Sequence, residues 1–397
     1  MTTPLLRIDD PAPPQPARWA LWQLGFRPFY LLAGCFGALS IALWALQVAG
    51  VLQSPWLAGP LWHAHEMLFG FALAVVVGFL FTAGRNWTQQ PTPSGGRLAA
   101  LAALWLAARV LVLTPHAWLS AIANLAFPLA CAAALARALV AAGNRRNYFF
   151  VALLAAMGLG SLTVHLQALG VVAWPAWTGI GLALDVMLFI LVVMGGRVIP
   201  MFTNNGVPGA DATRLPQVER AALGSVLALL AADALRVPAG LLALLAFCAA
   251  AAHAIRWLLW QPWRTARAPL VWVLHLGYAW IPAHLLLRGC AAAGWIGSSP
   301  ATHALTSGAI GLLVVGMMTR TSRGHTGRPL RADRWDVACY ALVAAAGFVR
   351  VLLPLAWPAA TLPAIAGSAT LWSLGMGVFT VRYWPVLTRA RVDGRPG

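Results

Sequence analysis

Two histidines and a glutamate stand at the mouth of a long apolar run. His63, His65 and Glu66 precede a stretch from Met67 to Ala83 that contains no charged residue. Ionisable groups at the edge of a bilayer-length helix are costly to place there, and membrane proteins that keep them usually use them. Imidazole is the commonest protein ligand for copper, zinc and haem iron, and a neighbouring carboxylate could relay protons. The cluster therefore predicts a metal or cofactor site.

The spacing of these two histidines limits how they can act. Two residues along a regular helix turn the side chain by about 200°. His63 and His65 therefore cannot face one ion unless His63 still lies in an extended entry segment. Otherwise they serve two separate centres. The competing interpretation is that they are interfacial polar residues that anchor a helix end beside Trp62.

The elements that must position these residues are membrane helices. The chain is 60% hydrophobic and only 9% charged, which is far from the composition of a soluble domain. We predict an all-α polytopic membrane protein with twelve apolar segments, each close to the length of about 20 residues that crosses a bilayer. The segments are 29–51, 62–84, 98–114, 118–141, 148–171, 176–199, 218–236, 239–259, 270–291, 302–319, 335–354 and 360–383.

The arginines of the chain are predicted to lie mostly on one side of the membrane. All 27 basic residues are arginines, and the formal net charge is +17. With a cytoplasmic N-terminus, all of them fall on the cytoplasmic side except Arg109, Arg236, Arg288 and Arg350. Cytoplasmic loops retain positive charge during insertion, so both termini are predicted to be cytoplasmic and the helix count even. Charge that alternates loop by loop is not the footprint of a nucleic-acid-binding surface.

Internal repetition is the next feature of the chain. Residues 28–384 are predicted to form one transmembrane domain between a proline-rich cytoplasmic tail, 1–27, and a basic tail, 385–397. The first tail has no apolar core of a signal peptide. Helix ends recur at a spacing near 120 residues, and His65 and His303 differ by 303 − 65 = 238, about twice that spacing. Three parallel four-helix units are therefore predicted, at roughly 28–141, 147–260 and 269–384.

Parallel units place equivalent residues at equal depth around a common centre. Several histidines at one level can converge on a metal, whereas a single one is more often an interfacial anchor. We therefore predict metal ligands among the five histidines at the periplasmic level, which are His63, His65, His165, His284 and His303.

Other polar residues in apolar segments have two interpretations each. Asp185 lies midway along its segment and is a candidate for a proton relay or a substrate contact. The alternative for Asp185 is a structural pairing with an arginine or a histidine. Glu66 is a second candidate for the proton relay. The outer arginines could snorkel to the interface, or they could line an anion-attracting vestibule, for example one that holds haem propionates. These arginines are Arg109, Arg236 and Arg350. His116 and His253 are assigned no function.

Several motifs of the chain resemble those of the NnrS family. They occur in order along the sequence, with Gln89 as a departure at a loop position where the family often has glycine. The resemblance implies a twelve-helix inner-membrane protein that contains haem and copper and is linked to nitric oxide. It marks His63, His65, His275 and His325 as the leading functional histidines. The motifs are Arg27–Phe29, Trp62–Gly70, Asn86–Thr88, Arg197–Asn204, His275–Tyr278 and Gly324–Leu330.

The function predicted from the sequence is relief of nitric-oxide stress by a haem- and copper-binding membrane protein of the bacterial inner membrane. Nitric oxide is small and apolar, so a metal inside the bilayer can meet it where it dissolves. Whether it is turned over is open. The alternatives are a permease for a metal, haem precursor or small anion that uses Asp185 and the outer arginines, and a sensor or assembly factor without turnover.

Overall fold

The computed structural model describes residues 19–52, 56–57, 59–175 and 177–394, which form helices and no strand. Two of the helices are continuous with a π-helical segment, η1 and η4. The α-helices and these two segments are α1 (Phe26–Val48), α2 (Gly59–His65), η1 (Glu66–Ala72), α3 (Leu73–Thr88), α4 (Gly95–Leu111), α5 (Ala117–Ala141), α6 (Phe149–Ala168), α7 (Thr178–Gly206), α8 (Pro216–Leu235), α9 (Ala239–Leu258), α10 (Pro269–Ala292), α11 (Ser298–His303), η4 (Ala304–Ile310), α12 (Gly311–His325), α13 (Arg334–Ala356) and α14 (Thr361–Thr388).

Ten of the described helices are long and apolar enough to cross a membrane. This makes the chain a multi-pass membrane protein, as its composition predicts. The other two expected crossings, 98–114 and 218–236, are the helices α4 and α8, which fall outside that set of ten. α4 has 17 residues, fewer than the about 20 of a usual crossing. α8 carries Glu219, Arg220 and Asp233.

The beginning and the end of the described chain meet at one end of the bundle. The Ala20 N–H donates to the Thr388 carbonyl at 2.8 Å, and the Arg27 guanidinium donates to the Arg389 carbonyl at 2.7 Å. We call this end the arginine end. At this end α1 begins at Phe26 and α14 continues to Thr388. The remainder of the predicted tails, residues 1–18 and 395–397, lies outside the described residues.

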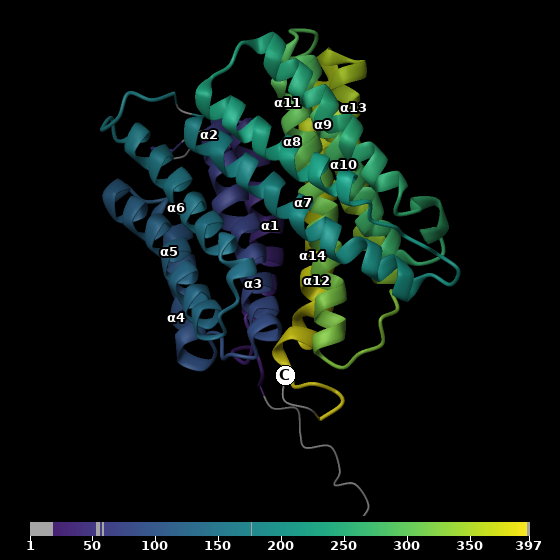
Figure 1. The fold of residues 1–397 in the computed structure, drawn as a ribbon. Coiled ribbons are helices and arrows are strands. Elements are labelled where there is room, and N and C mark those ends of the chain that lie inside the picture. Colours follow the sequence, from purple (N-terminus) through teal and green to yellow (C-terminus); the bar gives the residue numbers. More distant parts are fainter. Residues whose placement is uncertain (1–18, 53–55, 58, 176, 395–397) are drawn as a thin grey trace, which may run out of the picture.

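The first and last helices close the bundle, and two pairs of consecutive helices make similar contacts. α1 packs against α14, α5 against α6, and α9 against α10. In Figure 1, α4, α5 and α6 lie on one flank, and α9, α10 and α13 lie on the other. α2 and α11 lie at the end opposite the arginine end, which we call the histidine end.

An apolar cavity of about 70 Å³ lies between α3, α7 and α12. Side chains from all three helices line it, with contributions from Tyr30 of α1 and Leu274 of α10. The lining follows matching positions, since Val75 and Leu313 differ by 313 − 75 = 238, as do Phe79 and Met317 with 317 − 79 = 238. The centre of the bundle is therefore apolar.

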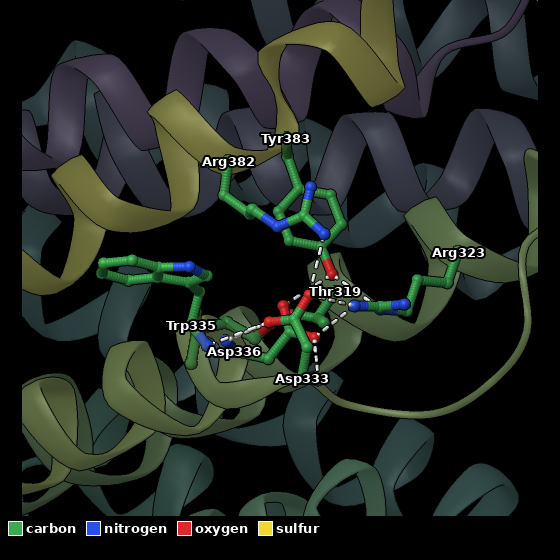
Figure 2. Close-up of polar contacts among 8 residues, drawn as sticks. Thr319, Arg323, Asp333, Trp335, Asp336, Arg382 and Tyr383 are labelled. Carbon is green, nitrogen blue, oxygen red and sulfur yellow. Dashed lines mark hydrogen bonds and ion pairs between the residues drawn. The ribbon is translucent and has the colours of Figure 1, made fainter.

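An ion-pair network ties α12, α13 and α14 together at the arginine end (Figure 2). Arg323 donates to Asp336 at 2.5 Å and to Asp333 at 3.1 Å, and the Tyr383 hydroxyl donates to Asp336 at 2.9 Å. Asp333 also caps α13 by accepting the Trp335 and Asp336 N–H groups. Burial opposes its ionisation, but the hydrogen bonds from Arg382 and from these backbone groups outweigh burial and lower the pKa of Asp333. The network is fully paired and structural.

The packing of α6 on α7 supplies a test of the fold. The backbones meet so closely at Gly160 and Gly179 that a Cβ on Gly179 would overlap the Gly160 carbonyl oxygen, whereas Gly181 faces open space. Gly179→Val should therefore destabilise the protein by about 1–3 kcal/mol through overpacking. The thermal unfolding midpoint in detergent measures this, with Gly181→Val as the matched control. Equal midpoints for the two variants would contradict the described packing.

Candidate functional site at the histidine end

A buried ion pair organises the histidine end. Glu66, 1% exposed, accepts from Arg109 Nη1 at 2.6 Å and lies 2.8 Å from His65 Nδ1. Arg109, 5% exposed, also donates to the side-chain oxygen of Asn124 on α5. Arg109 therefore neither snorkels to the interface nor offers a free charge to a vestibule. Its position inside the bundle is explained by the carboxylate that it neutralises.

This ion pair fixes the proton on His65. Glu66 Oε1 accepts from Arg109 and is the same oxygen that lies beside His65 Nδ1, so it accepts from His65 as well, which places the His65 proton on Nδ1 and the lone pair on Nε2. Nε2 lies 3.2 Å from the Ser161 hydroxyl of α6, which donates to it. A histidine oriented by a carboxylate through one nitrogen, with a lone pair on the other, is the usual arrangement of a metal-binding histidine.

His165 faces His65 across the site. The two ring centroids are 5.0 Å apart, the ring planes are nearly perpendicular at 89°, and both side chains are 0% exposed. The Trp56 ring also contacts His165, with ring centroids 5.2 Å apart. Among the described residues, neither ring nitrogen of His165 has a hydrogen-bond partner. Buried polar atoms are normally hydrogen-bonded, so the two unpartnered nitrogens make His165 a candidate ligand-binding residue.

A second histidine pair lies at the same end. His63 and His303 stack with ring centroids 6.4 Å apart and planes within 8°, and Trp44 stacks on His63 at 5.0 Å. His303 Nδ1 donates to the Ser299 carbonyl at 2.8 Å, and Arg350 donates to the Ser299 hydroxyl at 3.2 Å. His63 and His65 thus contact different partners.

His284 is the fifth histidine at this end. Its Nδ1 donates to the Ala301 carbonyl of α11 at 2.8 Å. Its Nε2 is buried and unpartnered among the described residues. The five predicted ligands are thus arranged as two pairs and one separate residue, and not as a single cluster. Within the described part of the chain, no group of three or more His, Cys, Asp or Glu side chains is placed to hold a metal ion.

π-Helical turns follow two of these histidines directly. η1 begins after His65 and η4 begins after His303. A π-helical turn inserts an extra residue and is frequent at functional sites. The wider turn changes the direction of the following side chains, and Glu66 is the first residue of η1. The sequence analysis did not predict these two π-helical segments.

The other predicted histidines lie elsewhere. His275 Nε2 donates to the Thr203 hydroxyl at 2.8 Å, since that hydroxyl itself donates to the Ile199 carbonyl, and Nδ1 has no partner among the described residues. His325 is half-buried at the arginine end, with its ring 5.7 Å from that of Phe26. Neither is among the contacts of the two histidine pairs.

The predicted polar groups at the outer level have separate surroundings. Asp185 accepts from Arg288 at 3.1 Å, and Arg288 also pairs with Asp233, so Asp185 has a structural partner. Arg236 is exposed and ends α8 in a left-handed conformation, while Arg350 binds Ser299. Together with the burial of Arg109, this shows that the three outer arginines do not share one lining.

The sequence analysis did not predict the buried hydrogen-bond network around Arg256. His253, assigned no function, lies 2.8 Å from the Tyr278 hydroxyl, which accepts from Arg256 at 2.9 Å. Arg256 in turn donates to Glu219 at 2.8 and 2.5 Å. His253 stands in an alanine-rich helix without a motif, so only packing shows its partners. The sequence analysis likewise did not identify Asn124 and Ser161 as site residues, because only the packing shows their contacts with Arg109 and His65.

Apolar spans around a buried carboxylate, arginine and histidines define a polytopic membrane protein with a candidate ligand site inside its helical bundle. The family model described as NnrS protein matches residues 20–391, nearly the whole chain. The chain belongs to the NnrS family, which is associated with the response to nitric oxide. None of the curated proteins compared with the chain matches it.

The Glu66–Arg109 pair gives a quantitative test of the site. Glu66→Ala leaves Arg109 charged and buried without its carboxylate, which should cost about 3–5 kcal/mol. Arg382→Ala, which removes an ion pair with Asp333 that is 42% and 35% exposed, should cost less than about 1 kcal/mol. Denaturation in detergent measures both. The double variant Glu66→Ala/Arg109→Leu should recover part of the loss, and no recovery would argue against a direct pair.

Proposed function

We propose that this protein relieves nitric-oxide stress with haem and copper, and that His65 and His165 hold the copper. The observation that supports this most directly is His165, a fully buried imidazole whose two nitrogens are unpartnered among the described residues and whose ring centroid lies 5.0 Å from that of His65. Both rings reach the same space from different helices, α2 and α6. The described side chains would supply two imidazole ligands and leave other positions open.

The geometry of this pair fits copper better than haem. Imidazole suits copper as a ligand, and ring centroids 5.0 Å apart allow two imidazoles to share one ion. The same separation leaves no space for a porphyrin plane between the rings. Haem therefore requires other histidines. His284, whose Nε2 is unpartnered, and the His63–His303 pair are the candidates at this end, and the family resemblance adds His275 and His325.

The chain's own residues prepare the copper site. Glu66 holds the proton of His65 on Nδ1 and can accept it, which makes Glu66 the candidate proton relay. Arg109 donates to the same carboxylate oxygen and holds it in place. Trp56 and the surrounding helices exclude water from His165. Copper, when bound, supplies a redox-active centre to which nitric oxide can coordinate.

Nitric oxide can reach such a site through apolar surroundings. It dissolves in the bilayer, and the central cavity of about 70 Å³ is lined by apolar side chains. Val75 of this lining lies ten residues beyond His65 on the continuous helix, a rise of about 15 Å. The cavity thus offers an apolar space within the same bundle.

The permease alternative has less support. It relied on Asp185 and on a ring of outer arginines. Asp185 is paired with Arg288, and the outer arginines have separate surroundings. An apolar central cavity also disfavours passage of an ion, because a charge would lose its hydration there.

The proposed function includes an arrangement in the membrane. We propose three four-helix units, 28–141, 147–260 and 269–384, with the histidine end facing the periplasm across the inner membrane. The packing of α1 on α14, α5 on α6 and α9 on α10 supports equivalent units, as does the 238-residue spacing shared by η1 and η4. The distribution of arginines supports the orientation.

Metal analysis and optical spectra of the purified protein test the copper site. His65→Ala and His165→Ala should each lose copper, because a single imidazole from this pair binds too weakly to retain it. His116→Ala is the control, since His116 is exposed in a short loop. Copper-free wild-type protein from copper-replete cells, or full copper in both variants, would contradict the assignment.

A cellular measurement tests the link to nitric oxide. Cells that depend on this protein should lose growth in the presence of a nitric-oxide donor when His65 or His165 is replaced by alanine, and should keep it with His116→Ala. Equal protection by all three variants, at equal protein levels in the membrane, would contradict a role of His65 and His165 in the response to nitric oxide.

A further inference from the structure

A charged pocket of about 260 Å³ lies toward the arginine end, between α6, α7, α8 and α9. Its lining contains four arginines and a single acid, Glu219. Phe149, Phe189, Val193 and Leu223 form an apolar wall. The arginines are Arg146, Arg197, Arg214 and Arg256.

The single acid is already neutralised. Glu219 accepts from Arg256 at 2.8 and 2.5 Å and from Arg214 at 3.1 Å. Arg256 is 1% exposed, and its N–H groups are engaged by Glu219, by the Val192 carbonyl and by the Tyr278 hydroxyl. Arg146 and Arg197 therefore contribute positive charge that no carboxylate of the lining offsets.

Arg197 is held in place before any ligand arrives. Its guanidinium lies over the Trp87, Phe149 and Phe150 rings at 6.0, 5.7 and 5.7 Å. One nitrogen donates to the Asn147 side chain at 2.9 Å. An arginine stacked in this way loses little conformational freedom when it binds an anion, and its planar array of N–H groups matches phosphate oxygens.

We propose that this pocket binds a phosphate group, carried by an anionic phospholipid or by a soluble phosphate. Basic pockets between transmembrane helices on the positively charged side of a membrane protein suit lipid headgroups. The apolar wall would contact the part of the ligand next to the phosphate. The pocket is formed by other residues than the histidine site, so the proposal does not depend on copper or haem.

Native mass spectrometry of the detergent-solubilised full chain tests the proposal. The probes are phosphatidylglycerol, phosphatidylcholine and inorganic phosphate. Wild-type protein should retain phosphatidylglycerol in preference to phosphatidylcholine. Arg146→Gln should weaken this retention by about fivefold, and Arg146→Gln/Arg197→Gln further, at about 1 kcal/mol for each arginine.

The matched control is Arg220→Gln. It removes the same charge at the same end of the protein, but Arg220 is exposed, donates to the Pro216 carbonyl and is not among the residues that line the pocket. Its retention of phosphatidylglycerol should stay at the wild-type level. An equal loss in Arg220→Gln and Arg146→Gln would overturn the proposal, because attraction to the whole charged face would then explain binding.

The two ligand sources give different results. If inorganic phosphate displaces phosphatidylglycerol from the wild type, and Arg146→Gln weakens that displacement, the pocket takes a free phosphate group. If phosphate has no effect while the phosphatidylglycerol preference depends on Arg146, the ligand is the lipid. Absence of both the lipid preference and phosphate binding, in protein whose thermal unfolding midpoint is intact, would overturn the proposal.

Discussion

Every charge inside an apolar bundle needs a partner, because the bilayer supplies no water to solvate it. This constraint explains most of the polar contacts of the protein. Each buried carboxylate meets an arginine from another helix, and loss of one partner would leave a bare charge. Such pairs select one arrangement of otherwise similar apolar helices. They are Glu66–Arg109, Asp185–Arg288, Glu219–Arg256 and Asp336–Arg323.

The histidine end combines this constraint with unpaired nitrogens. Glu66 is held by Arg109 and in turn orients His65, so the ion pair fixes one imidazole lone pair. His165 faces it without any partner of its own among the described residues. The site satisfies its charges but leaves both nitrogens of His165 unpartnered among the described residues, and this distinguishes it from the fully paired network around Arg323 (Figure 2).

The two ends of the bundle differ in what they offer. The histidine end presents neutral nitrogens in a buried setting, where a small apolar molecule can arrive from the lipid. The arginine end presents cations, and only part of them is neutralised by acids. The proposed function in nitric-oxide relief and the proposed phosphate site therefore rest on separate parts of one protein.

The sequence alone determined the class, the family resemblance and nearly all helix positions, because apolar segment length and short motifs are local properties. The two-residue spacing of His63 and His65 meant that they face different ways if both lie on a regular helix, and the structure places both on α2. Only the tertiary structure decided that His65 meets His165, that Arg109 neutralises Glu66 and that Asp185 is paired with Arg288. These contacts join residues 43 to 103 positions apart. They depend on how each helix is rotated against its neighbours, and helices that are apolar all round carry no pattern that records this rotation.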